Sequence, residues 1–173
     1  LPAKYNLSLV SLSGNPSVRL PPTTDRTQAR LAIQSLKVQD STALGEAVYV
    51  GLDALKMAPA APGGDPTPAP GAIVLLSDGQ NTAGRSPVQS ANAAQKAGVP
   101  IYTIAYGTAN GYVDLDGKRE QVPPDPQALS ALAAASGGRT YTAEDLGQLS
   151  RVYDNIRSEV GQTPTKKETT AIW

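Results

Sequence analysis

Apolar and polar positions alternate in short blocks along the chain, and these blocks predict strands and helices in turn. Residues 6–12 place Leu and Val on both faces of an extended segment. A Gly-Asn-Pro-Ser turn separates this segment from Val18-Arg19-Leu20, and Pro21-Pro22 follows. Two apolar runs around such a turn are typical of a β-hairpin, which the two prolines are expected to end.

Two helices are predicted after the hairpin. Thr24 would cap the first, over 25–36, with an apolar face made of Leu31, Ile33 and Leu36. The second covers 44–57, where apolar residues recur at helical spacing. It ends in a stretch rich in Pro and Gly, 59–71, which we expect to be a surface loop within one domain.

The second half begins with strands and helices in alternation. Residues 72–76 are continuously apolar, which is typical of a strand buried on both faces of a parallel sheet, and residues 99–105 predict the next buried strand. Between them, Ser86-Pro87 would open a helix that Gly98 closes. The segment 111–122, with Asp-Gly at its centre, predicts an inserted hairpin.

Three elements complete the chain. Asp125-Pro126 would open a helix that runs to Ser136, and a short strand is expected over 139–142. Thr142 with Asp145 resembles a capping box for a last amphipathic helix ending near residue 160.

Strand–helix alternation from 44 to 160 predicts the α/β fold class, with a doubly wound, Rossmann-like, mostly parallel sheet flanked by helices. Ligands of such sheets bind at the carboxyl ends of the strands. The candidate functional segments are therefore the loops 77–86 and 106–111 and the segment 40–46.

The amino-acid composition excludes several classes of binding partner and reaction. The 173 residues include 15 Lys+Arg and 15 Asp+Glu, and a neutral chain without a basic stripe argues against a nucleic-acid partner. Without Cys or His, a thiol nucleophile, an imidazole base and a Cys- or His-bound zinc are excluded. We therefore expect no enzymatic activity, and any metal would be held by oxygen atoms.

Two segments carry such oxygens. One is the apolar strand that runs into Ser77-Asp78-Gly79, and the other is Asp40-Ser41-Thr42 ahead of Gly45 and Glu46. Carboxylate and hydroxyl oxygens suit a hard divalent cation, although each segment alone is also a common turn or helix cap. Gly45 would permit close packing of its helix, and Glu46 is expected to be solvated in the first turn.

Together these segments resemble the von Willebrand factor A domain, the fold of integrin I domains. The resemblance covers roughly residues 4–160 and is carried by IVLLSDG (73–79), STALGEA (41–47) and VPIYTIAYG (99–107). In this family a metal-ion-dependent adhesion site holds Mg²⁺ or Mn²⁺ with three loops, and a partner's acidic residue completes the shell. The resemblance implies that Thr42 and Asp78 are the metal ligands of the second and third loops. It places on the partner-contact rim Ser41, Ser77, Gln80, Asn81 and Thr82.

The first loop of that family site, Asp-x-Ser-x-Ser, does not occur in this sequence. Ser11-Leu12-Ser13 has the Ser spacing, but Leu9 stands where the Asp should be. We therefore expect that the usual first, central strand is lacking and that Mg²⁺ or Mn²⁺ binds weakly or not at all, since such cations need about six oxygens. The sheet edge left open would permit self-association.

More narrowly, the chain resembles the membrane-anchored bacterial A-domain proteins of the Bat type, which are associated with MoxR-type AAA+ ATPases. The hairpin 111–122, Ser-Gly-Gly at 136–138 and the tail ending at Trp173 carry this likeness. It implies a domain over 1–162, a polar juxtamembrane-like tail over 163–173, and anchoring helices outside this chain, with the domain extracytoplasmic, in the periplasm or cell envelope.

The function implied is that of a protein–protein interaction domain with an incomplete adhesion site. The alternative is a metal-independent scaffold of a membrane complex that works with a MoxR-type ATPase.

Overall fold

The computed structural model describes residues 5–37, 41–59, 70–77, 81–106, 112–115, 118–121 and 125–161. Their elements follow in the order β1 (Leu7–Ser11), β2 (Ser17–Thr23), α1 (Arg26–Gln34), α2 (Leu44–Lys56), β3 (Ile73–Ser77), α3 (Pro87–Lys96), β4 (Ile101–Tyr106), β5 (Tyr112–Leu115), β6 (Lys118–Gln121), α4 (Pro126–Ser136), β7 (Thr140–Ala143) and α5 (Leu146–Gly161). Within these residues, no helix combines the length and the apolar character that a membrane crossing requires.

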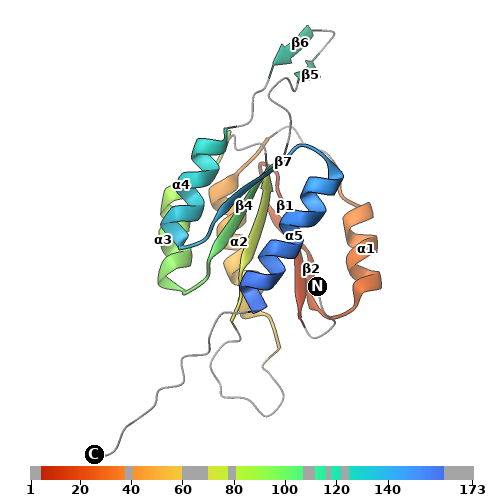
Figure 1. Cartoon of the computed structure of the whole chain (residues 1–173), viewed down its shortest axis with the longest axis vertical. Coiled ribbons are helices and arrows are strands. Elements are labelled where there is room, and N and C mark those ends of the chain that lie inside the picture. The colour runs from red at the N-terminus through yellow and green to blue at the C-terminus, as the bar shows by residue number, and fades with distance from the viewer. Residues whose placement is uncertain are drawn as a thin grey trace, which may run out of the picture.

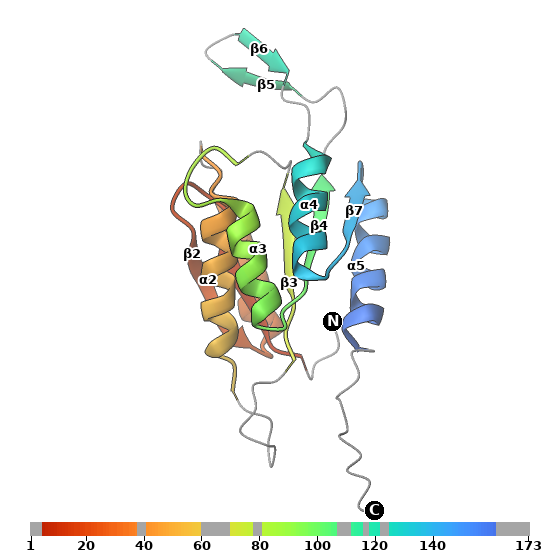
Figure 2. The same cartoon turned by 90° about the vertical axis from the view of Figure 1, so that its left-hand side faces the viewer.

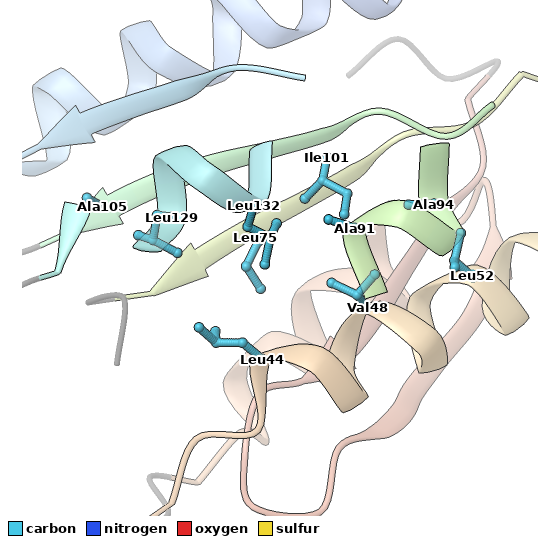
Figure 3. Packing of buried hydrophobic residues seen from close by; sticks show 10 residues of the cluster. All are labelled: Leu44, Val48, Leu52, Leu75, Ala91, Ala94, Ile101, Ala105, Leu129 and Leu132. Carbon is cyan, nitrogen blue, oxygen red and sulfur yellow. The ribbon is translucent and has the colours of Figure 1, made fainter. Parts of the chain in front are cut away.

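A three-stranded parallel sheet, in the order β3-β4-β7, forms the centre of the fold. Helices α2, α3 and α4 lie on one face, and α5 lies on the other (Figures 1 and 2). The first face carries the larger core, which gathers Leu75 of β3, Ile101 of β4 and Leu44 and Val48 of α2 with residues of α3 and α4 (Figure 3). The second core is smaller and gathers Tyr102, Ile104, Ala143, Val152 and Ile156.

The N-terminal hairpin forms a sheet of its own. Strands β1 and β2 pair antiparallel, with Val10 opposite Val18, and both pack against α1 and α2. Among the described strands β1 does not pair with β3, although both lie against α2. The expected mostly parallel sheet therefore contains only three of the described strands. No described strand pairs with both the hairpin and β3.

Two details of the hairpin region differ from the sequence-based expectation. Strand β2 continues through Pro21-Pro22 to Thr23, which is compatible with its place at the outside of a two-stranded sheet. The cap of α1 is Asp25 and not Thr24, since the Asp25 carboxylate accepts hydrogen bonds from the backbone N–H groups of Thr27 and Gln28 (2.8 and 3.1 Å).

The apolar face predicted for α1 was also wrong. Leu31, Ile33 and Leu36 are 61%, 53% and 42% exposed, and the buried residue of this helix is Ala29. Helix α1 packs on the hairpin alone among the strands, so only one narrow side of it is covered.

The C-terminal half follows its predicted elements closely. Asp125 caps α4 by accepting from the N–H of Ala128 (3.0 Å), and Gly137 ends that helix with φ of 81°. Strands β5 and β6 form the predicted antiparallel hairpin. Most of the predicted surface loop, residues 60–69, and all of the predicted tail, residues 163–173, lie outside the described residues.

The starts of α3 and α5 differ in detail from the prediction. Pro87 opens α3 as expected, but the side chain of Ser86 makes no capping hydrogen bond. At α5 the cap is Asp145, which accepts from the N–H of Gln148 (2.8 Å), whereas Thr142 lies within β7. A carboxylate one residue before the helix is nearer to the unpaired N–H groups than a hydroxyl in the preceding strand.

Candidate functional site

The segment ahead of α2 and the segment that follows β3 are joined at the carboxyl end of the parallel sheet. The backbone N–H of Thr42 donates to the hydroxyl of Thr82 (2.8 Å), which in turn lies 3.3 Å from the Thr42 carbonyl oxygen. That carbonyl also accepts from the N–H groups of Thr82 and Ala83 (2.8 and 3.2 Å). The described parts of these two candidate segments, residues 41–46 and 81–86, therefore lie side by side.

Asn81 supplies the cap that α2 lacks in its own sequence. The residue before the helix is Ala43, which has no polar side chain, and the Asn81 Oδ1 accepts from the N–H of Leu44 instead (2.8 Å). The N–H of Ala43 donates to the carbonyl of Ser13 in the β1–β2 turn (3.0 Å). Two segments that are distant from α2 in sequence therefore fix its start.

The predicted rim residues differ in their surroundings. Ser41 is exposed, whereas Ser77 is buried at the end of β3. The side-chain oxygens of Asn81 and Thr82 accept hydrogen bonds from the backbone of the neighbouring loop. Their role in partner contact stays a prediction, and Gln80 lies outside the described residues.

The predicted metal ligands were Thr42 and Asp78, and Asp78 lies outside the described residues. Thr42 is partly exposed, and its hydroxyl makes no hydrogen bond to another described residue. The described part of the chain contains no group of three or more acidic side chains that could hold a metal ion. One uncommitted hydroxyl does not fit a cation that needs about six oxygens, so the described residues alone do not make a metal site.

Glu46 lies in the first turn of α2, as expected, but its carboxylate is paired with Arg85. The guanidinium Nη2 lies 2.6 Å from Oε2 of the carboxylate, whose side chain is 29% exposed. The side-chain hydrogen bonds between them lower the pKa of Glu46 and raise the pKa of Arg85. Sequence reasoning missed this pair because 39 positions separate its members and no local spacing indicates it.

Gly45 permits the close packing that the sequence predicts. A Cβ atom at this position would overlap the carbonyl oxygen of Arg85, so the first turn of α2 touches the backbone of residues 81–86 directly.

A second group of titratable side chains lies between β7 and α5. The hydroxyl of Tyr141 donates to Oε1 of Glu159 (2.8 Å), which also accepts from Arg139 (3.2 Å). Burial, together with the hydrogen bond to Glu159, raises the pKa of Tyr141 to about 12. These contacts hold α5 against β7. Their residues lie far along the chain from Thr42.

Comparison with known proteins shows the family to which this chain belongs. The sequence profile of the von Willebrand factor type A domain matches residues 2–155. A UPF0353 protein of Mycolicibacterium gilvum is 36% identical over 174 residues, which cover 97% of this chain and 52% of that protein. The chain therefore spans about half the length of the curated relatives it matches.

Two solved structures share the fold. BatB from Bacteroides thetaiotaomicron superposes with a TM-score of 0.74 at 17% identity, over 91% of this chain and 80% of that one. An aerotolerance-related membrane protein from Bacteroides fragilis gives a TM-score of 0.72 at 18% identity, over 90% and 79%. The chain belongs to the von Willebrand factor type A domain family, and its fold is similar to those of these Bacteroides proteins.

Proposed function

We propose that this chain is the protein-interaction domain of a bacterial membrane-anchored protein. It contacts its partner through the edge loops, which we define as residues 41–44 and 81–83 at the carboxyl end of the parallel sheet. The observation that carries the proposal is the network of hydrogen bonds between Thr42 and Thr82. It joins the two loops into a single continuous surface. Binding sites of open α/β sheets lie at this edge.

The chemistry of the edge loops suits direct polar recognition. Ser41 is exposed, and the Thr42 hydroxyl makes no hydrogen bond within the described part of the chain, so it can donate one to a partner. An acidic side chain of the partner would accept such a bond, and hydrogen bonds to charged groups are among the stronger ones. Because the described residues do not make a cation site, the proposal assigns no step to Mg²⁺ or Mn²⁺, and we expect any binding of either ion to be weak.

The proposal includes no catalysis. The chain has no Cys and no His, so it lacks a thiol nucleophile and an imidazole base. The proposed membrane anchor agrees with the fold likeness to an aerotolerance-related membrane protein, and the extracytoplasmic placement of the domain is a further part of the proposal.

A second candidate is a metal-independent scaffold of a membrane complex that works with a MoxR-type ATPase. Large apolar side chains exposed on helices favour it, namely Val88 on α3 (50% exposed) and Leu146 on α5 (76% exposed). A scaffold of this kind would bind through helix faces and leave the edge loops uncovered.

Site-specific photo-crosslinking in the bacterium that encodes the protein separates the two candidates. A photoreactive residue at Ser41 tests the edge loops, one at Val88 tests α3, and one at the exposed Asn155 of α5 is the control. The proposal predicts a discrete protein adduct from Ser41 alone, unchanged by EDTA. An adduct from Val88 without one from Ser41 would favour the scaffold, and no adduct from Ser41 would refute the edge-loop proposal.

A further inference from the structure

Arg85 bonds the C-terminal end of residues 81–86 to the first turn of α2. Its Nε and Nη2 donate to the two carboxylate oxygens of Glu46 at 2.7 and 2.6 Å, and its backbone N–H donates to Oε1 at 3.2 Å. Such two-point pairing fixes direction as well as distance. The guanidinium also lies 3.7 Å from the ring centroid of Tyr49, one turn further along the helix.

Two glycines let the backbones approach closely enough for this pairing. A Cβ atom at Gly45 would overlap the Arg85 carbonyl oxygen. Gly84 has φ of 77°, and a Cβ atom there would lie 2.7 Å from Cγ of Glu46. The close approach and the left-handed turn both bring Arg85 to Glu46.

The same segment carries the groups that hold the loop before α2. Asn81 and Thr82, which bond the backbone of Thr42 and Leu44, are separated from Arg85 by three residues or fewer. A fixed Arg85 therefore limits where these two side chains lie.

We propose that Glu46 and Arg85 are positioning residues for the edge loops: their pairing holds residues 81–86 so that Asn81 and Thr82 stay bonded to the backbone of Thr42 and Leu44. The inference rests on the proposed function, because it concerns the same surface. The Arg85 side chain is 52% exposed, so the pair contributes modestly to global stability. Its main effect is on local order.

Amide hydrogen exchange followed by NMR tests this on the chain itself. In Arg85→Ala, the N–H groups of Thr42, Leu44, Thr82 and Ala83 should lose about tenfold or more in protection, while that of Thr103 in β4 changes little. Arg85→Lys keeps the positive charge but lacks the planar guanidinium that makes the two-point pairing. Its amide protection should therefore lie between that of the wild type and that of Arg85→Ala.

Lys56→Ala is the matched control, because it breaks an exposed ion pair with Asp53 on the same helix. It should leave the exchange of the edge loops unchanged. Wild-type protection of the edge loops in Arg85→Ala would overturn the inference, and so would an equal loss of protection at Thr103, which reports global destabilisation.

The functional arm is the Ser41 crosslink in the Arg85→Ala background. If the edge loops bind the partner and Arg85 positions them, the adduct yield should fall several-fold. Absence of an adduct from the wild-type protein would refute the proposed function, while the exchange data would still decide whether Arg85 positions the loops.

Discussion

Val74 and Tyr102 are register partners on β3 and β4, yet 39% of Val74 is exposed against 7% of Tyr102. Helix α5 packs on β4 and β7, so it covers Tyr102 and leaves its neighbour open. The next pair on the same face repeats the contrast, since Leu76 is 40% exposed beside a fully buried Ile104. Strand β3 thus presents an apolar strip at the outside of the parallel sheet.

This strip predicts self-association of the chain. Residues 72–77 contain no charge and no proline, the features with which proteins protect an edge strand. We expect concentration-dependent association in sedimentation experiments, weakened about tenfold or more by Leu76→Lys. Leu31→Lys, at a 61% exposed position on α1, is the control. A chain that stays monomeric at every concentration would contradict the prediction, as would an equal effect of both variants.

Gly45→Ala should destabilise the domain, whereas Gly51→Ala on the same helix should not. The added Cβ at Gly45 meets the backbone of Arg85, which has little freedom to move, and overpacking of this kind costs about 1–3 kcal/mol. At Gly51 the new atom would lie 3.1 Å from Cδ1 of Ile73, a side chain that can adjust, and Ala favours the helix by about 1 kcal/mol. Urea denaturation measures both changes, and equal free energies of unfolding for the two variants would argue against the close contact.

Alkaline pH should weaken the fold through Tyr141. Burial and the hydrogen bond to Glu159 raise the pKa of Tyr141 from its ordinary 10.0 to about 12. The folded state keeps the proton more tightly than the unfolded state does. The stabilisation is therefore complete below about pH 10 and is lost as the pH rises toward about 12.

The test is the thermal midpoint across that pH window in the wild type and in Tyr141→Phe. The variant cannot ionise at this position, so its midpoint should fall less steeply with pH. Identical slopes would show that Tyr141 does not titrate in the way its surroundings indicate.

The sequence predicted elements best where a local pattern determines them. The apolar runs became β3 and β4 as predicted, and Asp125 with Gly137 correctly bounded α4. The predicted burial on both faces holds for β4 but was wrong for β3, whose Val74 and Leu76 are 39% and 40% exposed. The buried face of helix α1 was predicted wrongly, because its apolar residues were expected to pack in a core. Leu31 and Ile33 instead face solvent, since this helix packs on the hairpin alone among the strands.

The candidate site was predictable only in outline. That the Thr42 segment and the loop after β3 meet follows from the topology of a parallel sheet, and the structure shows it. The use of Asn81 as the cap of α2, and of Arg85 as the partner of Glu46, depends on the path of a loop between distant segments. Spacing along the chain carries no signal of such contacts.

Titration with Mn²⁺ by isothermal calorimetry is the most direct measurement of whether the edge loops work without a cation site of their own. We predict no saturable heat up to about 1 mM Mn²⁺, either for the chain or for Thr42→Ala, because the sequence lacks the Asp-x-Ser-x-Ser loop whose oxygens a cation would need. One-to-one binding tighter than about 100 µM that Thr42→Ala abolishes would contradict this account, because it would reveal a complete metal site at the proposed contact surface.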